Sequence, residues 1–137
     1  MRYTLLDRQK DGLILLARFL LMTLFVIFGW EKLTDFSGTA TYMASIGTPA
    51  PGVAAVIAIV MEFFVAIALI AGIYTRPLAL LLALYTLATA LVGHHYWTLT
   101  GEAHMENMIN FYKNISIVGG LLLLCVTGPG KYSVDRR

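Results

Sequence analysis

The chain has 137 residues, of which 58% are hydrophobic and 13% are charged, and its formal net charge is +2 at pH 7. Soluble domains carry about 25% charged residues, so the polar surface of a water-soluble globule is missing and an integral membrane protein is predicted. The small net charge argues against nucleic acid as a partner, and the single cysteine, Cys125, excludes an intrachain disulfide or a multi-cysteine metal site.

The first predicted membrane helix covers about residues 13–30. No small-x-small cleavage site follows it, so we expect a retained helix and not a cleaved signal peptide. Side chains that recur at three- and four-residue spacing share one helix face, and here they are Arg18, Met22, Phe25, Gly29 and Lys32. Breaks at 35–38 and at TPAPG (48–52) predict an outer loop over residues 31–52.

The second predicted helix, about residues 53–73, carries one charge, Glu62, near its middle. A charge at the centre of a bilayer costs about 2.5–3.5 kcal/mol on insertion scales, and intramembrane ionisable residues are by default functional candidates. We therefore expect Glu62 to face the interior of the bundle.

The third and fourth helices are predicted at about 77–93 and 108–127, after the turn Thr75-Arg76-Pro77 and before the stop at Gly128-Pro129-Gly130. Their leucine- and alanine-rich runs lack the alternation of barrel strands. The sequence thus predicts an all-α fold, an integral membrane four-helix bundle that forms one domain over residues 1–137.

The basic residues predict the orientation of this bundle. Seven of the ten fall on one side of four spans: Arg2, Arg8, Lys10, Arg76, Lys131, Arg136 and Arg137. The positive-inside rule then places both termini in the cytoplasm and the loops 31–52 and 93–107 outside.

The remaining charges predict a polar cluster inside the bundle. Helical rise places Arg18 roughly 9 Å, Glu62 roughly 16 Å and Lys113 roughly 20 Å above the cytoplasmic end. Asn107, Asn110 and Asn114 share a helix face with Lys113. Two interpretations remain open: an Arg18–Glu62 ion pair that orients two helices, or a site for a polar headgroup or for protons.

The loop GHHYWTLTGEAHMEN contains His94, His95 and His104, which are weak candidates for metal ligands. Their spacing fits no standard metal site. An interfacial polar loop is the simpler interpretation, and a hydrogen bond from a histidine to a carbonyl-bearing ligand is preferred to metal binding.

Several stretches together resemble the DoxX family of small bacterial inner-membrane proteins, in particular its YphA-type members. They are LLARFLLMTLFVIFGWEKLTDFSGTATYMASIGTPAPG, VMEFFVAIALIAGIYTRPLAL, GHHYW and NMINFYKNISIVGGLLLL, and they cover nearly the whole chain. The resemblance implies a multi-pass protein of the bacterial inner membrane. The polar positions of the family correspond in this chain to Arg18, Gly29, Lys32, Glu62, Arg76, His94, Asn110, Lys113 and Asn114.

The resemblance also implies a link to quinones, because DoxX and DoxD relatives are associated with quinone-linked oxidation, including thiosulfate:quinone oxidoreductase. We therefore expect a redox- or quinone-associated accessory component, which supplies a quinone pocket or a membrane anchor while another subunit carries the redox centre, and not an autonomous enzyme. The candidate ligand-binding residues are Arg18, Glu62, His94, Asn110, Lys113 and Asn114. The alternatives are a structural or assembly partner and, with less support, a small lipid or weak-acid transporter; a homo-oligomer is compatible with each.

Overall fold

The computed structural model describes residues 5–135, and within this range every regular element is a helix. The elements in chain order are η1 (Asp7–Gln9), α1 (Lys10–Thr34), α2 (Phe36–Ser45), α3 (Pro51–Ile59), η2 (Val60–Val65), α4 (Ala66–Ala71), α5 (Thr75–Gly93), η3 (Tyr96–Thr98) and α6 (Gly101–Thr127).

Four helical stretches are long and apolar enough to cross a membrane: Asp7–Thr34, Pro51–Ala71, Thr75–Thr98 and Gly101–Thr127. This confirms the predicted all-α class with four membrane spans. The second span consists of α3, η2 and α4 in direct succession, because the backbone passes from α-helix to π-helix and back without leaving helical geometry.

The segment 31–52 differs from the predicted loop. The first helix continues to Thr34, and the chain bends at Asp35, whose φ is −136°. The Asp35 carboxylate then accepts a hydrogen bond from the backbone N–H of Gly38 at 3.1 Å and caps α2. Residues 35–38 therefore do break the first helix, but they also begin a second one.

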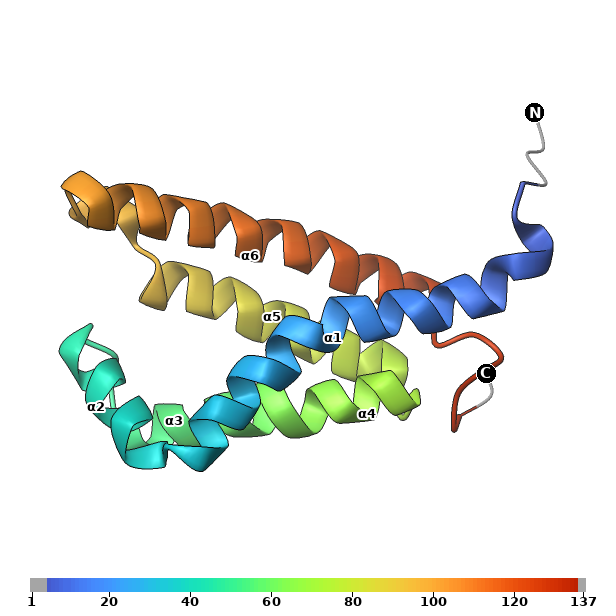
Figure 1. Cartoon of the computed structure of the whole chain (residues 1–137), viewed down its shortest axis with the longest axis horizontal. Coiled ribbons are helices and arrows are strands. Elements are labelled where there is room, and N and C mark those ends of the chain that lie inside the picture. The colour runs from blue at the N-terminus through green and yellow to red at the C-terminus, as the bar shows by residue number, and fades with distance from the viewer. Residues whose placement is uncertain (1–4, 136–137) are drawn as a thin grey trace.

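The spans are arranged as two helix pairs (Figure 1). One pair is α5 with α6, and the other is α1 with the span from α3 to α4, whose outer end α2 covers. The pairs meet where η2 and α4 contact α5, and where α1 contacts α6. Among the described residues α2 and α3 make no contact with α5 or α6, so the pairs diverge toward the end that carries α2.

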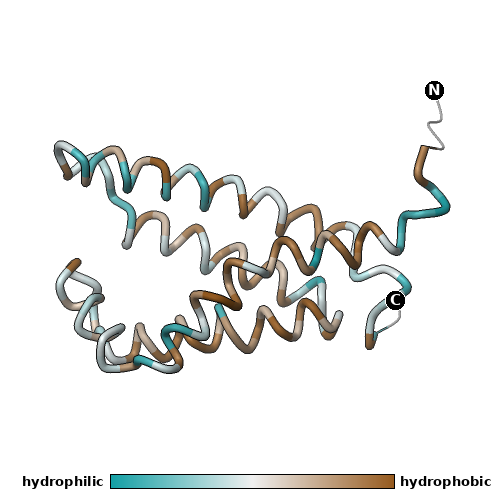
Figure 2. Tube along the Cα trace, in the orientation of Figure 1, coloured by the Kyte–Doolittle hydropathy of each residue, from teal (hydrophilic) through white to brown (hydrophobic). Residues whose placement is uncertain are grey.

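The interior and the exterior are both apolar. Met22, Leu69, Leu82 and Leu121 are fully buried between the helices. Large apolar side chains also point outward along the spans, and hydrophobic residues prevail along most of the helical trace (Figure 2). An exterior of this kind suits lipid, not water.

The predicted face of α1 is confirmed. Its buried residues are Arg18, Met22, Phe25 and Gly29, which are four of the five residues selected by their spacing in the sequence, and the fifth, Lys32, is 25% exposed.

Both described ends of the chain lie at the same end of the bundle, as an even number of spans requires (Figure 1). The Asp11 carboxylate accepts a hydrogen bond from the backbone N–H of Lys131 at 3.0 Å. The Arg76 side chain reaches the carboxyl end of α6 and donates to the carbonyl oxygens of Cys125 and Val126, at 3.0 and 2.6 Å. Arg2, Arg136 and Arg137, which also entered the orientation prediction, lie outside the described residues.

That this end faces the cytoplasm stays a prediction. In a background where alanine replaces Cys125, cysteines at the exposed positions Thr41 and Thr100 should react with a membrane-impermeant maleimide added outside the inner membrane. A cysteine at the exposed position Arg8 should react only after the membrane is permeabilised. Labelling in the opposite order would reverse the orientation.

Candidate functional site

Glu62 lies in a π-helical segment in the middle of the second span. This segment, η2, covers Val60–Val65 between α3 and α4. The π-helix has wider turns than the α-helix, is rare, and occurs frequently at functional sites. The single charge of the span therefore coincides with its single departure from α-helical geometry.

Glu62 joins three elements through its carboxylate. One oxygen forms an ion pair of 3.0 Å with the ammonium of Lys32 on α1. The other oxygen accepts a hydrogen bond of 2.5 Å from the hydroxyl of Tyr85 on α5. The side chains of Lys32 and Glu62 remain 25% and 13% exposed, so this Glu62 cluster (Lys32, Glu62 and Tyr85) is partly accessible.

Gly29 lets α1 approach the π-helical segment closely. A Cβ atom on Gly29 would lie 2.6 Å from the carbonyl carbon of Glu62 and 2.7 Å from the backbone nitrogen of Phe63. Real Cβ atoms do not approach backbone so closely, so only glycine fits here. Lys32 is one turn further along α1, which brings its side chain to the Glu62 carboxylate.

The predicted ion pair between Arg18 and Glu62 is wrong. The guanidinium of Arg18 donates instead to the carbonyl oxygens of Pro129 and Tyr132, at 2.5 and 2.6 Å. The reason is the antiparallel register, because Gly29 lies against Glu62 whereas Arg18 lies beside Gly72. Ten helical residues separate Gly72 from Glu62, or roughly 15 Å along the axis.

The predicted polar residues of α6 form contacts of their own. Lys113 donates to the side-chain oxygen of Asn110 at 3.0 Å, and Asn114 donates to the Thr89 hydroxyl on α5 at 3.4 Å. In the part of the chain that the structure describes, none of these side chains hydrogen bonds to Glu62.

Each of the three histidines has a separate partner. His94 contacts the side chain of Asn107 at 3.1 Å, His95 contacts the hydroxyl of Thr98 at 2.6 Å, and His104 contacts the carbonyl oxygen of Tyr96 at 2.9 Å. No group of three metal-ligating side chains occurs within residues 5–135. Nδ1 of each ring thus serves to order the turn between α5 and α6.

Two residues of the Glu62 cluster were not among the candidates from the sequence. The sequence predicts an end of the first helix near residue 30 and therefore places Lys32 in the outer loop, although its spacing also puts it on the face of Arg18 and Gly29. Tyr85 is the single tyrosine of α5. A tyrosine hydroxyl inside a membrane requires a hydrogen-bond partner, which is the signal that could have identified it.

Four apolar spans around a partly accessible acid–base pair define a small polytopic membrane protein with an intramembrane polar site. The DoxX family model matches residues 13–95, and the chain belongs to the DoxX family.

Two similar proteins have nearly the same length as this chain. Inner membrane protein YphA of Escherichia coli (strain K12) is 52% identical over 137 residues, which cover 100% of this chain and 98% of that protein. Inner membrane protein YqjF of the same organism is 40% identical over 131 residues, which cover 96% of this chain and 95% of that protein. Together with the four spans, these relatives place the chain in the inner membrane.

A more distant similarity extends to eukaryotes. The ER-derived vesicles protein ERV29 of Saccharomyces cerevisiae is 27% identical over 131 residues, which cover 96% of this chain but 35% of the yeast protein. No solved structure matches the chain.

Proposed function

We propose that this protein is an accessory component of the inner membrane that binds the polar head of a membrane-soluble quinone at the Glu62 cluster. The observation that carries the proposal is the partly exposed ion pair between Lys32 and Glu62, to which the Tyr85 hydroxyl also donates a hydrogen bond. Glu62 itself lies in a π-helical segment within a span. Intramembrane charges of this kind commonly mark ligand or proton pathways.

The chemistry of the cluster suits a carbonyl-bearing headgroup. Quinone oxygens are hydrogen-bond acceptors, and the Lys32 ammonium has three N–H donors, of which one points to Glu62. Lys32 would donate to a quinone oxygen, while Glu62 and Tyr85 hold its side chain in place. A bound quinone supplies two-electron, two-proton redox chemistry, and its electrons would come from a separate redox subunit, which is the protein partner that this proposal implies.

The polar residues of α5 and α6 are secondary candidates under this proposal. His94, Asn110, Lys113 and Asn114 belong to the divergent helix pair and not to the Glu62 cluster. Lys32 then has the main binding role, and Lys113 has a minor one.

A structural role is the second candidate. Both oxygens of Glu62 already have partners, and these partners come from two different helices. The cluster would then hold α1, η2 and α5 together without any ligand. Interhelical hydrogen bonds in membranes stabilise bundles by about 0.6 kcal/mol on average, so such a role is physically sufficient.

Binding of a short-chain quinone to the protein purified in neutral detergent distinguishes the two roles. We expect saturable binding to the wild type and a loss of roughly tenfold or more in Lys32→Met, since a charge-assisted hydrogen bond contributes about 1.5–3 kcal/mol. Lys113→Met should weaken binding much less.

Lys131→Met is the matched control, because Lys131 is an exposed lysine at the opposite end of the bundle from α2. This variant should bind the quinone as the wild type does. Thermal unfolding of every variant tests whether the helices remain folded, which matters most for Lys32→Met because it removes the charge partner of Glu62. Absence of measurable quinone affinity in the folded wild type would contradict the proposal and leave the structural role.

A further inference from the structure

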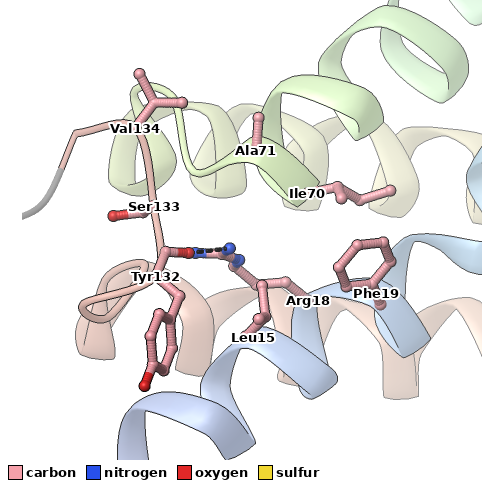
Figure 3. A pocket seen from close by; sticks show the side chains of 8 residues that line it. All are labelled: Leu15, Arg18, Phe19, Ile70, Ala71, Tyr132, Ser133 and Val134. Carbon is pink, nitrogen blue, oxygen red and sulfur yellow. Dashed lines mark hydrogen bonds between the residues drawn. The ribbon is translucent and has the colours of Figure 1, made fainter.

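A hollow of about 610 Å³ lies between α1, α4 and the C-terminal segment, residues 128–135 (Figure 3). Leu15, Phe19, Ile70, Ala71 and Val134 form apolar walls, and Arg18 lies among them. The hollow is at the end of the bundle that carries the chain termini, and is thus separate from the Glu62 cluster.

The guanidinium of Arg18 is a buried cation, and no carboxylate of the described residues pairs with it. Its residue is 1% exposed, and within residues 5–135 no Asp or Glu oxygen lies within 4.0 Å of it. Within the described part of the chain, the carbonyl oxygens of Pro129 and Tyr132 accept its hydrogen bonds, and its buried Nε–H has no acceptor there. Buried charges are normally paired, so this arrangement leaves both a charge and a donor unmatched.

The C-terminal segment is held against the end of α4 by backbone hydrogen bonds. Its backbone N–H groups at Val134 and Asp135 donate to the carbonyl oxygens of Ala71 and Gly72, at 3.0 and 3.1 Å. It therefore docks along the end of α4 by a few hydrogen bonds and has no helix of its own. Its Tyr132 and Val134 side chains are largely exposed, so they can shift without disturbing the core.

We propose that this hollow binds the anionic headgroup of a membrane phospholipid. Arginine forms stronger, bidentate hydrogen bonds with phosphate oxygens than with neutral carbonyls. A phosphate would exchange with the carbonyl oxygens of the C-terminal segment and also engage Nε–H, which supplies the missing negative charge. The apolar walls would contact the acyl chains, which favours a lipid over a soluble anion.

The test uses the full chain in neutral detergent, with dioctanoyl phosphatidylglycerol as the probe and thermal unfolding as the readout. Phosphatidylglycerol should raise the unfolding midpoint saturably, and dioctanoyl phosphatidylcholine should do so much more weakly. In Arg18→Gln the half-saturating concentration should rise about tenfold or more, the effect of losing a charge-assisted hydrogen bond. Lys131→Gln, which removes an exposed positive charge from the same segment, should behave as the wild type does.

Val134→Trp keeps the proposal testable if Arg18→Gln does not fold. This substitution leaves Arg18 and its carbonyl contacts intact but fills the hollow, and it should likewise weaken the phosphatidylglycerol response. An undiminished response in a folded Val134→Trp or Arg18→Gln variant would overturn the proposed site. An equal saturable response to inorganic phosphate alone would overturn the assignment to a lipid.

Discussion

Gly29→Ala should lower the free energy of unfolding by about 2–3 kcal/mol, at the upper end of what overpacking costs in soluble cores. The added methyl group would overlap the backbone of Glu62 and Phe63, which cannot move aside as a flexible side chain does. α1 must then move away from η2, which lengthens the 3.0 Å contact between the Lys32 ammonium and the Glu62 carboxylate. Reversible unfolding in mixed detergent and dodecyl sulfate measures the loss.

Gly119→Ala is the matched control, because Gly119 is also a glycine inside a membrane helix and a Cβ placed there would meet no described atom within 4 Å beyond the adjoining backbone of its own helix. Alanine is favoured over glycine in a helix by about 0.5–1 kcal/mol, so this variant should be as stable as the wild type or slightly more stable. Equal stability of the two variants would show that α1 and η2 are not in close contact.

Lys32→Met should be the most destabilising removal of a single charge, because it leaves the Glu62 carboxylate unpaired inside a span. Breaking a buried ion pair costs about 3–5 kcal/mol in soluble proteins, and less in a membrane, where the unfolded reference state finds other partners. Glu62→Leu should be similarly harmful, and the double variant should recover part of the loss. We expect a coupling energy on the order of 1–2 kcal/mol.

The control for this cycle is the pair Arg18→Leu and Glu62→Leu. Arg18 contacts the C-terminal segment, so these two effects should add. If instead Arg18 and Glu62 are coupled while Lys32 and Glu62 are not, the ion pair described above is incorrect.

Composition predicted the membrane class, and helical periodicity predicted the buried face of α1. Arg18, Met22, Phe25 and Gly29 recur at the spacing of one helix face, and apolar side chains around them favour lipid, so local sequence was sufficient. The same reasoning could not define the ends of helices. Asp35 serves as a cap as well as a break, and this distinction depends on its side-chain contact with Gly38.

The partners of the charged residues depended on information that periodicity does not contain. Heights along ideal helices brought Arg18 within reach of Glu62, but the close contact at Gly29 sets a register that separates them. The π-helical turn at Glu62 has no signature in the composition of Val60–Val65 that we could identify. The hydrogen bonds of Arg18 are accepted by backbone carbonyl groups of the C-terminal segment. Every residue has such a group, so residue types alone could not identify these acceptors.

The contacts of Arg18 also determine the order in which the molecule can be completed during synthesis. Its acceptors lie 111 and 114 residues later in the chain. At about 5–20 residues per second, the ribosome makes those residues roughly 5–20 s after it makes Arg18. During this interval the first span holds a guanidinium without its final acceptors, and it can extend toward the membrane surface to remain hydrated. α1 is made before the other three spans and is therefore among the last of them to reach its final environment.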